Sequence, residues 1–433
     1  MEDLPADRSE EAFDDYKPPY TPNQAKVEAN RCLYCHDAPC ITACPTSIDI
    51  PTFIRKIATE NVKGSARTIF DSNVLGMSCA RVCPVEVLCV GDCVYNEMGV
   101  PPIQIGKLQR FATDMAFDEG WSYYEAGADT GKSVGIVGAG PAGLACAHRL
   151  RRFGHAVTIY EKRDVVGGLN TTGVAPYKMP AGRSVQEVEW VMAIGGIEVK
   201  TGVSVPTDVS WEALEAAHDA LFVCFGLGPD SQLAADGADL DGVEGAVAWI
   251  ERMKLSTVRT DHARVLVIGG GNTALDCVRE ATGLGMPTTM VYRGTEAKMS
   301  GYAHEWAAAK QAGATAAWRT QPVGFVGEDG KVTGVRCVRL DDDKQPIAGS
   351  EHVLEGDLVL LAIGQSKLGE LAAALDGVEV DWGRILCDEH GATGRPGVYV
   401  GGDCRNGGKE VVNAVAHGRD AAIAIHERLS GGN

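Results

Sequence analysis

Two sets of closely spaced cysteines are the first candidates for chemistry in this sequence. The first set has the spacing Cys-x2-Cys-x4-Cys-x3-Cys-Pro and begins at Cys32; the second, Cys-x3-Cys-Pro-x5-Cys-x3-Cys, begins at Cys79. Zinc sites commonly use paired cysteine knuckles separated by a longer loop. A continuous run that ends in Cys-Pro is typical of iron–sulfur ligands instead. A chain without an export signal keeps its thiols reduced, which disfavours disulfides. The two sets therefore favour two iron–sulfur clusters, with zinc and disulfides as the alternatives.

A glycine-rich turn predicts a dinucleotide site. Gly138, Gly140 and Gly143 form Gly-x-Gly-x-x-Gly directly after the apolar run "SVGIV". The first glycine allows a tight turn, the second lets the backbone approach a pyrophosphate, and the third lets helix and strand pack closely. Glu161 ends the next predicted strand, where a carboxylate accepts hydrogen bonds from ribose hydroxyls and repels a 2′-phosphate. The turn therefore predicts a site for an unphosphorylated ADP moiety, that of FAD.

A second turn repeats this layout. Gly269, Gly271 and Ala274 form Gly-x-Gly-x-x-Ala after "RVLVI", and Arg293 stands where the first unit has Glu161. An arginine there attracts a 2′-phosphate. We therefore expect a nicotinamide nucleotide in the second unit, with a preference for NADPH; the alternative is that Arg293 is a solvated surface residue.

A third turn near the C-terminus completes the first site. Gly402 and Asp403 end a strand-like run and precede a long amphipathic stretch. A carboxylate at that place can accept hydrogen bonds from ribityl hydroxyls, and the N-terminus of the following helix can face a pyrophosphate. Alone this would be an ordinary turn, but beside the first glycine turn it predicts part of an FAD site.

The helices and strands that position these residues can be predicted from the hydropathy pattern of the chain. Short apolar runs alternate with amphipathic stretches from Ser133 onward, which indicates βαβ units and parallel sheets. The fold class is therefore α/β, with two Rossmann-like dinucleotide-binding domains preceded by a mainly α-helical iron–sulfur domain. Because the last segment returns most simply to the first unit, the NAD(P) domain is predicted to be inserted in the FAD domain. The expected boundaries are 1–130 for the helical domain, 131–245 and 371–433 for the FAD domain, and 246–370 for the NAD(P) domain.

The composition of the chain argues against some classes of partner and location. The formal net charge of -18 argues against nucleic acid, and no apolar run approaches the roughly 20 residues of a membrane helix. The acidic N-terminus lacks the apolar region of a secretion signal. We therefore expect a cytoplasmic protein whose acidic charge serves solubility or a partner protein.

The motifs together identify a family resemblance over nearly the whole chain. The sequence resembles the flavoproteins that include the NAD(P)H-oxidising subunit of bacterial dihydropyrimidine dehydrogenase and the small subunit of glutamate synthase. The resemblance rests on "RCLYCHDAPCITACPTSIDIPTFI", "SCARVCPVEVLCVGDCV", "IQIGKLQRFATD", "VGAGPAGLACA", "VVGGL", "PYKMP", "IGGGNTALDC" and "GGDCRNGGKEVVNAVAHGRDAA".

The resemblance implies a crossed set of metal ligands. One 4Fe-4S cluster would be held by Cys32, Cys35, Cys40 and Cys93, and the other by Cys44, Cys83, Cys89 and Gln109. Cys79 would be a spare thiol. The family's cofactor sites map onto two further sets. FAD would be held by Gly138, Gly140, Pro141, Ala142, Gly143, Glu161, Gly168, Leu169, Gly402 and Asp403, and NAD(P)H by Gly269, Gly271, Asn272, Thr273 and Arg293.

The function implied is that of an electron-transfer subunit, in which no protein side chain acts as a catalyst because the cofactors supply the chemistry. Electrons would move between NAD(P)H, FAD and the two clusters, to or from a partner catalytic subunit in a hetero-oligomer. The leading partner is a dihydropyrimidine dehydrogenase subunit that carries FMN and iron–sulfur clusters and reduces uracil or thymine. The alternatives are the large subunit of glutamate synthase and a 2-oxoacid:ferredoxin-type oxidoreductase. Gln109 and the lack of a long spacer before "RVLVIGGGNTALDC" favour the first, whereas "DMAFDEGW" resembles glutamate synthase.

Overall fold

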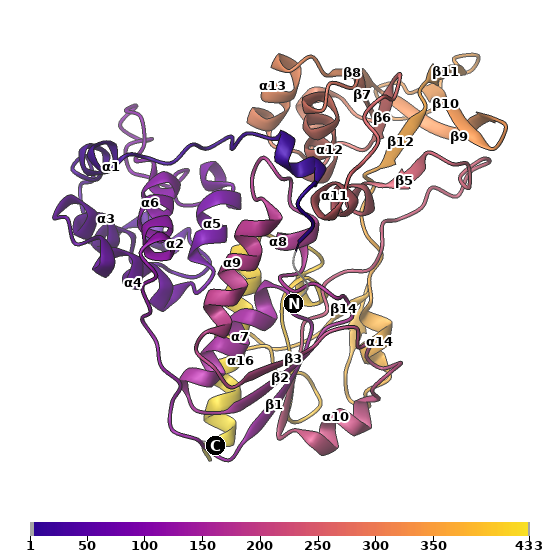
Figure 1. Cartoon of the computed structure of the whole chain (residues 1–433). Coiled ribbons are helices and arrows are strands. Elements are labelled where there is room, and N and C mark those ends of the chain that lie inside the picture. Colours follow the sequence, from indigo (N-terminus) through magenta and orange to yellow (C-terminus); the bar gives the residue numbers. More distant parts are fainter. Residues whose placement is uncertain (1–3, 432–433) are drawn as a thin grey trace.

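The computed structural model describes residues 4–431 and divides them into a helical module and two α/β units (Figure 1). The helices of the helical module are α1 (Pro22–Ala29), α2 (Pro39–Thr42), α3 (Ile50–Ala58), α4 (Val62–Ser72), α5 (Gly76–Val82) and α6 (Ile105–Asp118). Asp49 and Asn61 begin α3 and α4, accepting hydrogen bonds from Thr52 N at 3.1 Å and Gly64 N at 2.9 Å, as N-cap residues do. The helical character predicted for this part of the chain is confirmed.

The first α/β unit is built on a five-stranded parallel sheet in the order β15-β4-β1-β2-β3. Its strands are β1 (Ser133–Val137), β2 (Ala156–Tyr160), β3 (Ile197–Lys200), β4 (Ala220–Val223) and β15 (Val398–Val400). Its helices are α7 (Pro141–Arg152), α8 (Leu169–Thr172), α9 (Ala181–Met192), α10 (Trp211–Ala217), α15 (Asp403–Asn406) and α16 (Val411–Leu429). Because β15 pairs with β4, the C-terminal segment returns to the first unit as the sequence predicted.

The second α/β unit has its own parallel sheet, in the order β5-β12-β6-β7-β8. Its elements are β5 (Val243–Gly245), α11 (Ala246–Leu255), β6 (Val265–Ile268), α12 (Asn272–Gly283), β7 (Thr288–Tyr292), α13 (Ala303–Gln311), β8 (Thr315–Trp318) and β12 (Leu358–Leu361). They lie between β4 and β15 in the chain, so this unit is inserted in the first. Since β5 pairs with β12, we propose that the second unit begins near Val243, ahead of the expected boundary at 246.

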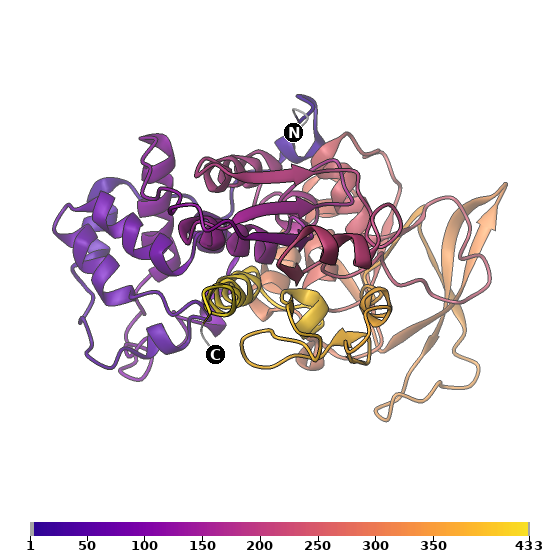
Figure 2. The same ribbon diagram turned by 90° about the horizontal axis from the view of Figure 1, so that it is seen from below.

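A three-stranded antiparallel sheet is attached to the second unit. It consists of β9 (Thr320–Glu328), β10 (Lys331–Arg339) and β11 (His352–Glu355), in the order β11-β10-β9. Seen from below, this sheet and the helical module lie at opposite ends of the molecule (Figure 2). This sheet was not among the predicted elements.

Aromatic packing joins the helical module to the first unit. The ring of Trp190 on α9 lies 4.6 Å from that of Phe70 on α4 and 5.6 Å from that of Phe117 on α6, measured between centroids. The connecting residues 121–132 have no regular secondary structure, but Trp190 Nε1 donates to Trp121 O at 3.1 Å. The connection is therefore hydrogen-bonded to the first unit through Trp121. It is bonded to the helical module through Tyr123 Oη, which donates to Lys63 O at 3.1 Å.

Residues 4–20, here called the N-terminal strap, touch all three parts of the molecule. Ser9 N donates to Ser256 O of the second unit at 3.0 Å, and Tyr16 N donates to Tyr177 O of the first unit at 3.1 Å. Asp15 pairs with Arg110 of α6 at 2.5 Å. The strap thus holds the helical module and both α/β units together (Figure 1).

Candidate functional site

Four of the cysteines predicted to be metal ligands surround one cavity in the helical module. This first cavity encloses about 380 Å³ and is lined by Cys32, Cys35, Cys40 and Cys93, together with apolar residues such as Ile54. Burial, with the neighbouring thiols, raises the pKa of the Cys40 thiol to about 12. Such a thiol ionises readily only beside a strong positive charge, which a metal cluster supplies.

The remaining predicted ligands surround a second cavity. It encloses about 350 Å³ and is lined by Cys44, Cys83, Cys89 and Gln109. Cys79, expected to be a spare thiol, also lines it. The structure thus brings together, around two separate cavities, the two ligand sets that the resemblance implied.

The donor sets fit clusters better than single ions. All fourteen cysteines have free thiols. Within residues 4–431, no three His, Cys, Asp or Glu side chains converge as closely as one metal ion needs, since zinc draws its ligands to within about 2.3 Å. The thiols surround a volume rather than a point, which is the arrangement that a four-iron cluster requires.

The second cavity adjoins the first α/β unit. Val412, in the first turn of α16, lines it together with the cysteines. Arg419, two turns further along α16, donates to Thr46 O at 2.7 Å and to Ser72 O at 3.2 Å in the helical module. The helix that follows the Gly402–Asp403 turn therefore reaches the wall of the second cavity.

The first glycine turn has the geometry of a phosphate cradle. Gly138 adopts φ +114°, and a Cβ at Gly143 would lie 2.1 Å from Gly138 O. At Gly140 a Cβ would meet nothing closer than Gly168 Cα at 3.9 Å, so the space above Gly140 is open. Helix α7 begins at Pro141 without a side-chain cap, and Ala142 is buried in its first turn. The first backbone N–H groups of α7 therefore remain available for an anion.

Glu161 lies at the end of β2 and is held by the backbone around it. Its Oε2 accepts from Ala139 N at 2.7 Å and its Oε1 from Arg163 N at 2.9 Å. A carboxylate offers about four lone-pair sites, so Glu161 keeps capacity for ribose hydroxyls. The same contacts fix the carboxylate against the glycine turn.

The turn at Gly402 and Asp403 meets the first turn of α7. A Cβ at Gly402, which adopts φ +71°, would lie 3.3 Å from Ala142 Cβ. Gly402 N donates to His417 Nδ1 at 3.2 Å, and Asp403 Oδ1 accepts from Lys409 N at 3.2 Å. Burial raises the pKa of the Asp403 carboxyl. The Gly402 turn thus lies against the predicted pyrophosphate site.

A buried lysine supports the Gly168–Leu169 segment from the other unit. Lys254 of α11 is fully buried, and its Nζ donates to Asn170 O, Val174 O and Met179 O at 3.1, 2.8 and 2.7 Å. Burial lowers the pKa of Lys254 to about 8. Lys254 was not among the predicted site residues, and His417 was expected to be a packing or surface residue, because the partners of a lone lysine or histidine cannot be inferred from local sequence.

The second glycine turn repeats the geometry of the first. Gly269 adopts φ +143°, and a Cβ there would lie 2.3 Å from Ala362 O. At Gly271 a Cβ would meet only Ser300 Oγ at 3.7 Å, so this turn is open too. Asn272 and Thr273 begin α12, and Asn272 Oδ1 accepts from Tyr302 N at 3.2 Å.

Arg293 follows β7 and is exposed. Its guanidinium has no hydrogen bond or ion pair with any part of the chain that the structure describes. The nearby acid, Glu296, is paired with Lys310 Nζ at 2.7 Å, which reduces its repulsion of an anion.

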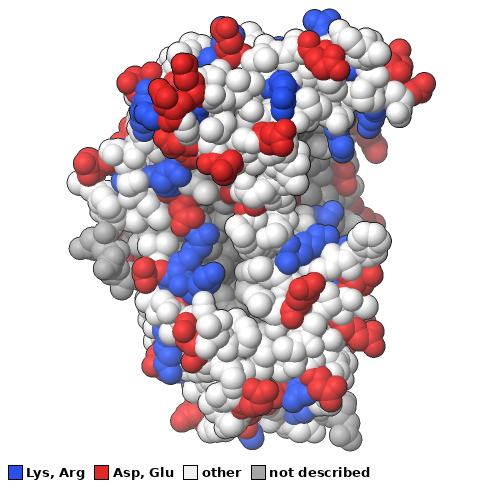
Figure 3. Space-filling model, turned by 90° about the vertical axis from the view of Figure 1, so that its right-hand side faces the viewer, with Lys and Arg blue, Asp and Glu red and all other residues white. Residues whose placement is uncertain are grey.

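On the face shown in Figure 3, acidic and basic side chains are interspersed, and basic groups lie on either side of a hollow at mid-height.

Buried ion pairs join the two α/β units beside these turns. Lys178, from the "PYKMP" segment of the first unit, pairs with Asp276 of α12 at 2.7 Å and with Glu305 of α13 at 2.6 Å. Tyr177 Oη donates to Asp276 Oδ1 at 2.6 Å. Removing one partner of such a pair would leave a buried charge unpaired. The motif thus fixes one unit against the other.

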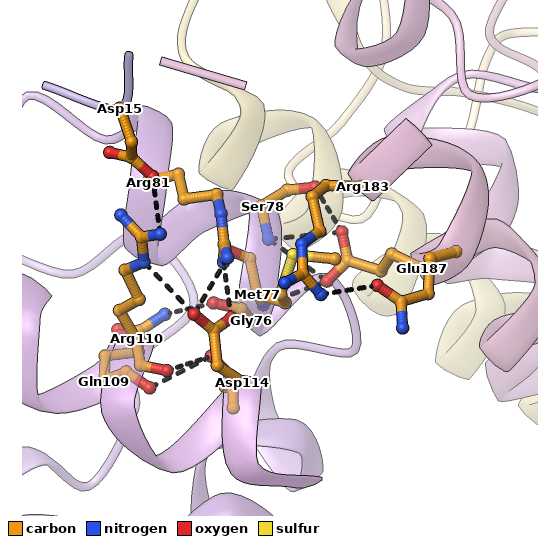
Figure 4. Close-up of polar contacts among 12 residues, drawn as sticks. Asp15, Gly76, Met77, Ser78, Arg81, Gln109, Arg110, Asp114, Arg183 and Glu187 are labelled. Atoms are coloured by element: carbon orange, nitrogen blue, oxygen red, sulfur yellow. Dashed lines mark hydrogen bonds and ion pairs between the residues drawn. The ribbon is translucent and has the colours of Figure 1, made fainter. Parts of the chain in front are cut away.

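Glu187 joins the first unit to the wall of the second cavity. This buried residue of α9 accepts from Met77 N at 2.9 Å and from Ser78 N at 3.2 Å, and it also bonds to Ser78 Oγ. Figure 4 shows its carboxylate facing the start of α5, with Gln109 and the pairs among Arg81, Asp114 and Arg110 on the opposite side.

We expect Glu187→Gln to flatten the pH dependence of stability. Burial raises the pKa of Glu187 to about 7, above its usual value of about 4.3. The folded protein therefore binds a proton that the unfolded chain releases, and stability falls as pH rises through this window, by about 3 kcal/mol. Glutamine imitates the protonated form, so the apparent melting temperature of the variant holoprotein should change less between about pH 5 and 7.5. An equal fall in both proteins would contradict this.

Comparisons with known proteins agree with this geometry. Residues 132–418 match the pyridine nucleotide-disulphide oxidoreductase family, and residues 8–121 match the family described as dihydropyrimidine dehydrogenase domain II, 4Fe-4S cluster. The chain belongs to the pyridine nucleotide-disulphide oxidoreductase family. Like other members, it is an NAD(P)H-dependent FAD oxidoreductase, and its N-terminal domain adds 4Fe-4S clusters.

Two relatives from Escherichia coli K12 cover almost the whole chain. The glutamate synthase [NADPH] small chain is 34% identical over 94% of this chain and 92% of its own length. The NAD-dependent dihydropyrimidine dehydrogenase subunit PreT is 35% identical over 97% of this chain and 98% of its own. These nearly equal identities do not separate the two branches.

A solved structure shares the fold of the two α/β units. Thioredoxin reductase from T. acidophilum superposes with a TM-score of 0.55 at 21% identity, over 69% of this chain and 99% of its own. Within the described residues, no helix is long and apolar enough to cross a membrane.

Proposed function

We propose that this chain is an electron-transfer subunit that moves electrons between NAD(P)H and a partner catalytic subunit. FAD and two 4Fe-4S clusters, when bound, supply the conversion between two-electron and one-electron chemistry. The chain's own residues orient these groups: FAD on the Gly138, Gly402 and Gly168 turns, and NAD(P)H on the Gly271 turn beside Arg293.

The order of the two cavities is the observation that carries this proposal. Val412 of α16, the helix that follows the Gly402 turn, lines the second cavity. In this proposal the second cavity is therefore the one nearer the flavin. The first cavity is lined by Leu33, which is 53% exposed, so it lies on the solvent side. Two relay sites in this order suit an exit for electrons through the helical module.

The exposed apolar side chains of the helical module support a docking surface for the partner there. Leu33 is accompanied in this module by Val27, Val87, Met98 and Val100, all large hydrophobic residues with exposed side chains. A contiguous apolar patch formed by such side chains would be typical of a protein interface.

The partner we propose is a dihydropyrimidine dehydrogenase catalytic subunit. Gln109 at the second cavity and the 98% coverage of the PreT relative support this assignment. The large subunit of glutamate synthase is the second candidate, supported by 34% identity to that enzyme's small chain.

The experiment for the partner is reconstitution. The purified chain is mixed anaerobically with each candidate catalytic subunit, and NAD(P)H oxidation is followed with and without that subunit's substrate. Oxidation that depends on uracil or thymine and on the pyrimidine subunit would support the proposal. Oxidation only with the glutamate synthase large subunit would select the second candidate.

We expect Arg293→Glu to change the choice of nucleotide. If the exposed guanidinium binds a 2′-phosphate, the wild-type flavin is bleached at lower concentrations of NADPH than of NADH. Loss of a charge-assisted hydrogen bond costs about 1.5–3 kcal/mol, so the NADPH needed for half-bleaching should rise roughly 10- to 150-fold while that of NADH stays unchanged.

The matched control for this titration is Lys331→Glu, the same charge reversal at an exposed position on β10. It should leave both titrations unchanged. Equal responses of NADPH and NADH in Arg293→Glu would assign Arg293 to the solvated surface.

A further inference from the structure

The second cavity has one thiol, that of Cys79, in addition to the four ligands expected for its cluster. A 4Fe-4S cluster takes four protein ligands, yet this cavity is lined by four cysteines (Cys44, Cys79, Cys83 and Cys89) and by two amide side chains, Gln109 and Asn73. The Oδ1 atom of Asn73 already accepts from Leu75 N at 3.1 Å. In the first cavity all four cysteines belong to the expected ligand set, so no thiol is left over there. The second cavity therefore offers alternative thiol ligands for one cluster, whereas the first cavity does not.

Cys79 is placed on the same face of α5 as an expected ligand. It precedes Cys83 by four residues, and side chains at that spacing are neighbours on a helix. The side chain of Cys79 is 2% exposed and lies among the cavity-lining residues, so its sulfur is beside the space that the cluster would fill.

Gln109 would be the weakest ligand of the expected set. Its Nε2 donates to Gly76 O at 2.8 Å, which leaves its Oε1 as the atom able to bind iron. An amide oxygen is a neutral, hard ligand, whereas iron–sulfur clusters prefer soft thiolates. Gly76, which holds the amide, is one turn before Cys79 on α5 (Figure 4). The same helix thus carries the anchor of one candidate ligand and the sulfur of the other.

We propose that the fourth iron of the second cluster can be bound by either Gln109 Oε1 or Cys79 Sγ, with Cys79 as the reserve ligand that takes the position when Gln109 leaves it. With a cluster bound, the sulfur of Cys79 would replace the amide oxygen of Gln109 on the same iron, and the thiol would release its proton to solvent, as metal-bound thiols do. No electron is exchanged in this step. The thiolate adds one negative charge to the cluster, so the form bound by Cys79 has the lower reduction potential.

Neither side chain alone is then required for a complete cluster. Gln109→Ala, Cys79→Ser and the double variant are purified anaerobically, and iron content, flavin content and the EPR spectrum after mild oxidation are measured. Both single variants should keep about eight irons per chain, as two 4Fe-4S clusters require. The double variant should lose one iron and show the signal of a three-iron cluster. The midpoint potential of the second cluster should fall in Gln109→Ala and stay unchanged in Cys79→Ser.

A role for Cys79 in packing alone gives a different pattern. In that case Gln109→Ala loses the iron by itself, or the double variant keeps all of its iron, and either result overturns the proposal. The flavin content of each variant reports whether the fold survives. The inference rests on the two clusters of the proposed function: absence of iron from the wild-type protein would contradict the clusters themselves, whereas loss confined to Gln109→Ala contradicts only the role of Cys79.

Discussion

Gly143→Ala is expected to yield a folded chain that retains little FAD. The added Cβ would lie 2.1 Å from Gly138 O and 3.1 Å from Cys224 Sγ. The first of these is a backbone atom of the cradle itself, so α7 must move away from β1. Such overpacking costs about 1–3 kcal/mol, which corresponds to a roughly 5- to 150-fold loss of affinity if it opposes FAD binding. The ratio of flavin absorbance to protein after purification measures the effect.

Gly182→Ala is the matched control for this substitution. Gly182 lies in α9 of the same unit, and a Cβ there has nothing within 4 Å. This variant should keep its flavin, and it should melt no lower than wild type because alanine favours helix. Full flavin occupancy in Gly143→Ala would show that α7 can shift without disturbing the site. The second glycine turn already has an alanine at the position that corresponds to Gly143. This residue, Ala274, is fully buried.

The glycine turns could be predicted because local sequence determines them. Gly138 and Gly269 both adopt a positive φ, a conformation that only glycine adopts without strain. The apolar runs before them become the buried strands β1 and β6. Spacing and composition within about ten residues therefore determine these parts of the fold.

The ligand partition could not be predicted from spacing, because it depends on tertiary structure. Cys93 reaches the first cavity although it belongs to the second cysteine run, and Cys44 reaches the second cavity although it belongs to the first. The resemblance, rather than the spacing, implied this crossing. Glu187 was missed for the same reason, since its partners Met77 and Ser78 lie more than a hundred residues away in the chain.

The antiparallel sheet was missed for a different reason. The stretch that forms β9 and β10 alternates buried and exposed residues only in part, and β-bulges interrupt the register near Val332 and Arg336. Bulges break the two-residue period on which strand prediction relies. The long chain between β8 and β12 therefore gave no clear pattern.

Cys44→Ser is expected to separate flavin reduction from electron delivery. Cys44 lines the second cavity, which in the proposed function is the relay site nearer the flavin. A serine hydroxyl is a poor substitute for a thiolate in a cluster, so iron should fall below about eight per chain, by about one if a three-iron cluster remains and by about four if the cluster is lost. NAD(P)H should still bleach the flavin at the wild-type rate, because both glycine turns are unchanged.

Delivery of electrons to a one-electron acceptor protein or to the partner subunit should fall by at least about a hundredfold in this variant, since each 1.4 kcal/mol added to a barrier slows a step tenfold. Cys146→Ser is the matched control: Cys146 is also buried, but it packs in the core of the first unit and lines neither cavity. It should keep its iron and its rate of delivery. If Cys44→Ser keeps the wild-type rate with half of the iron, electrons leave the flavin without passing the second cavity, and the order of the two cavities has no part in the function.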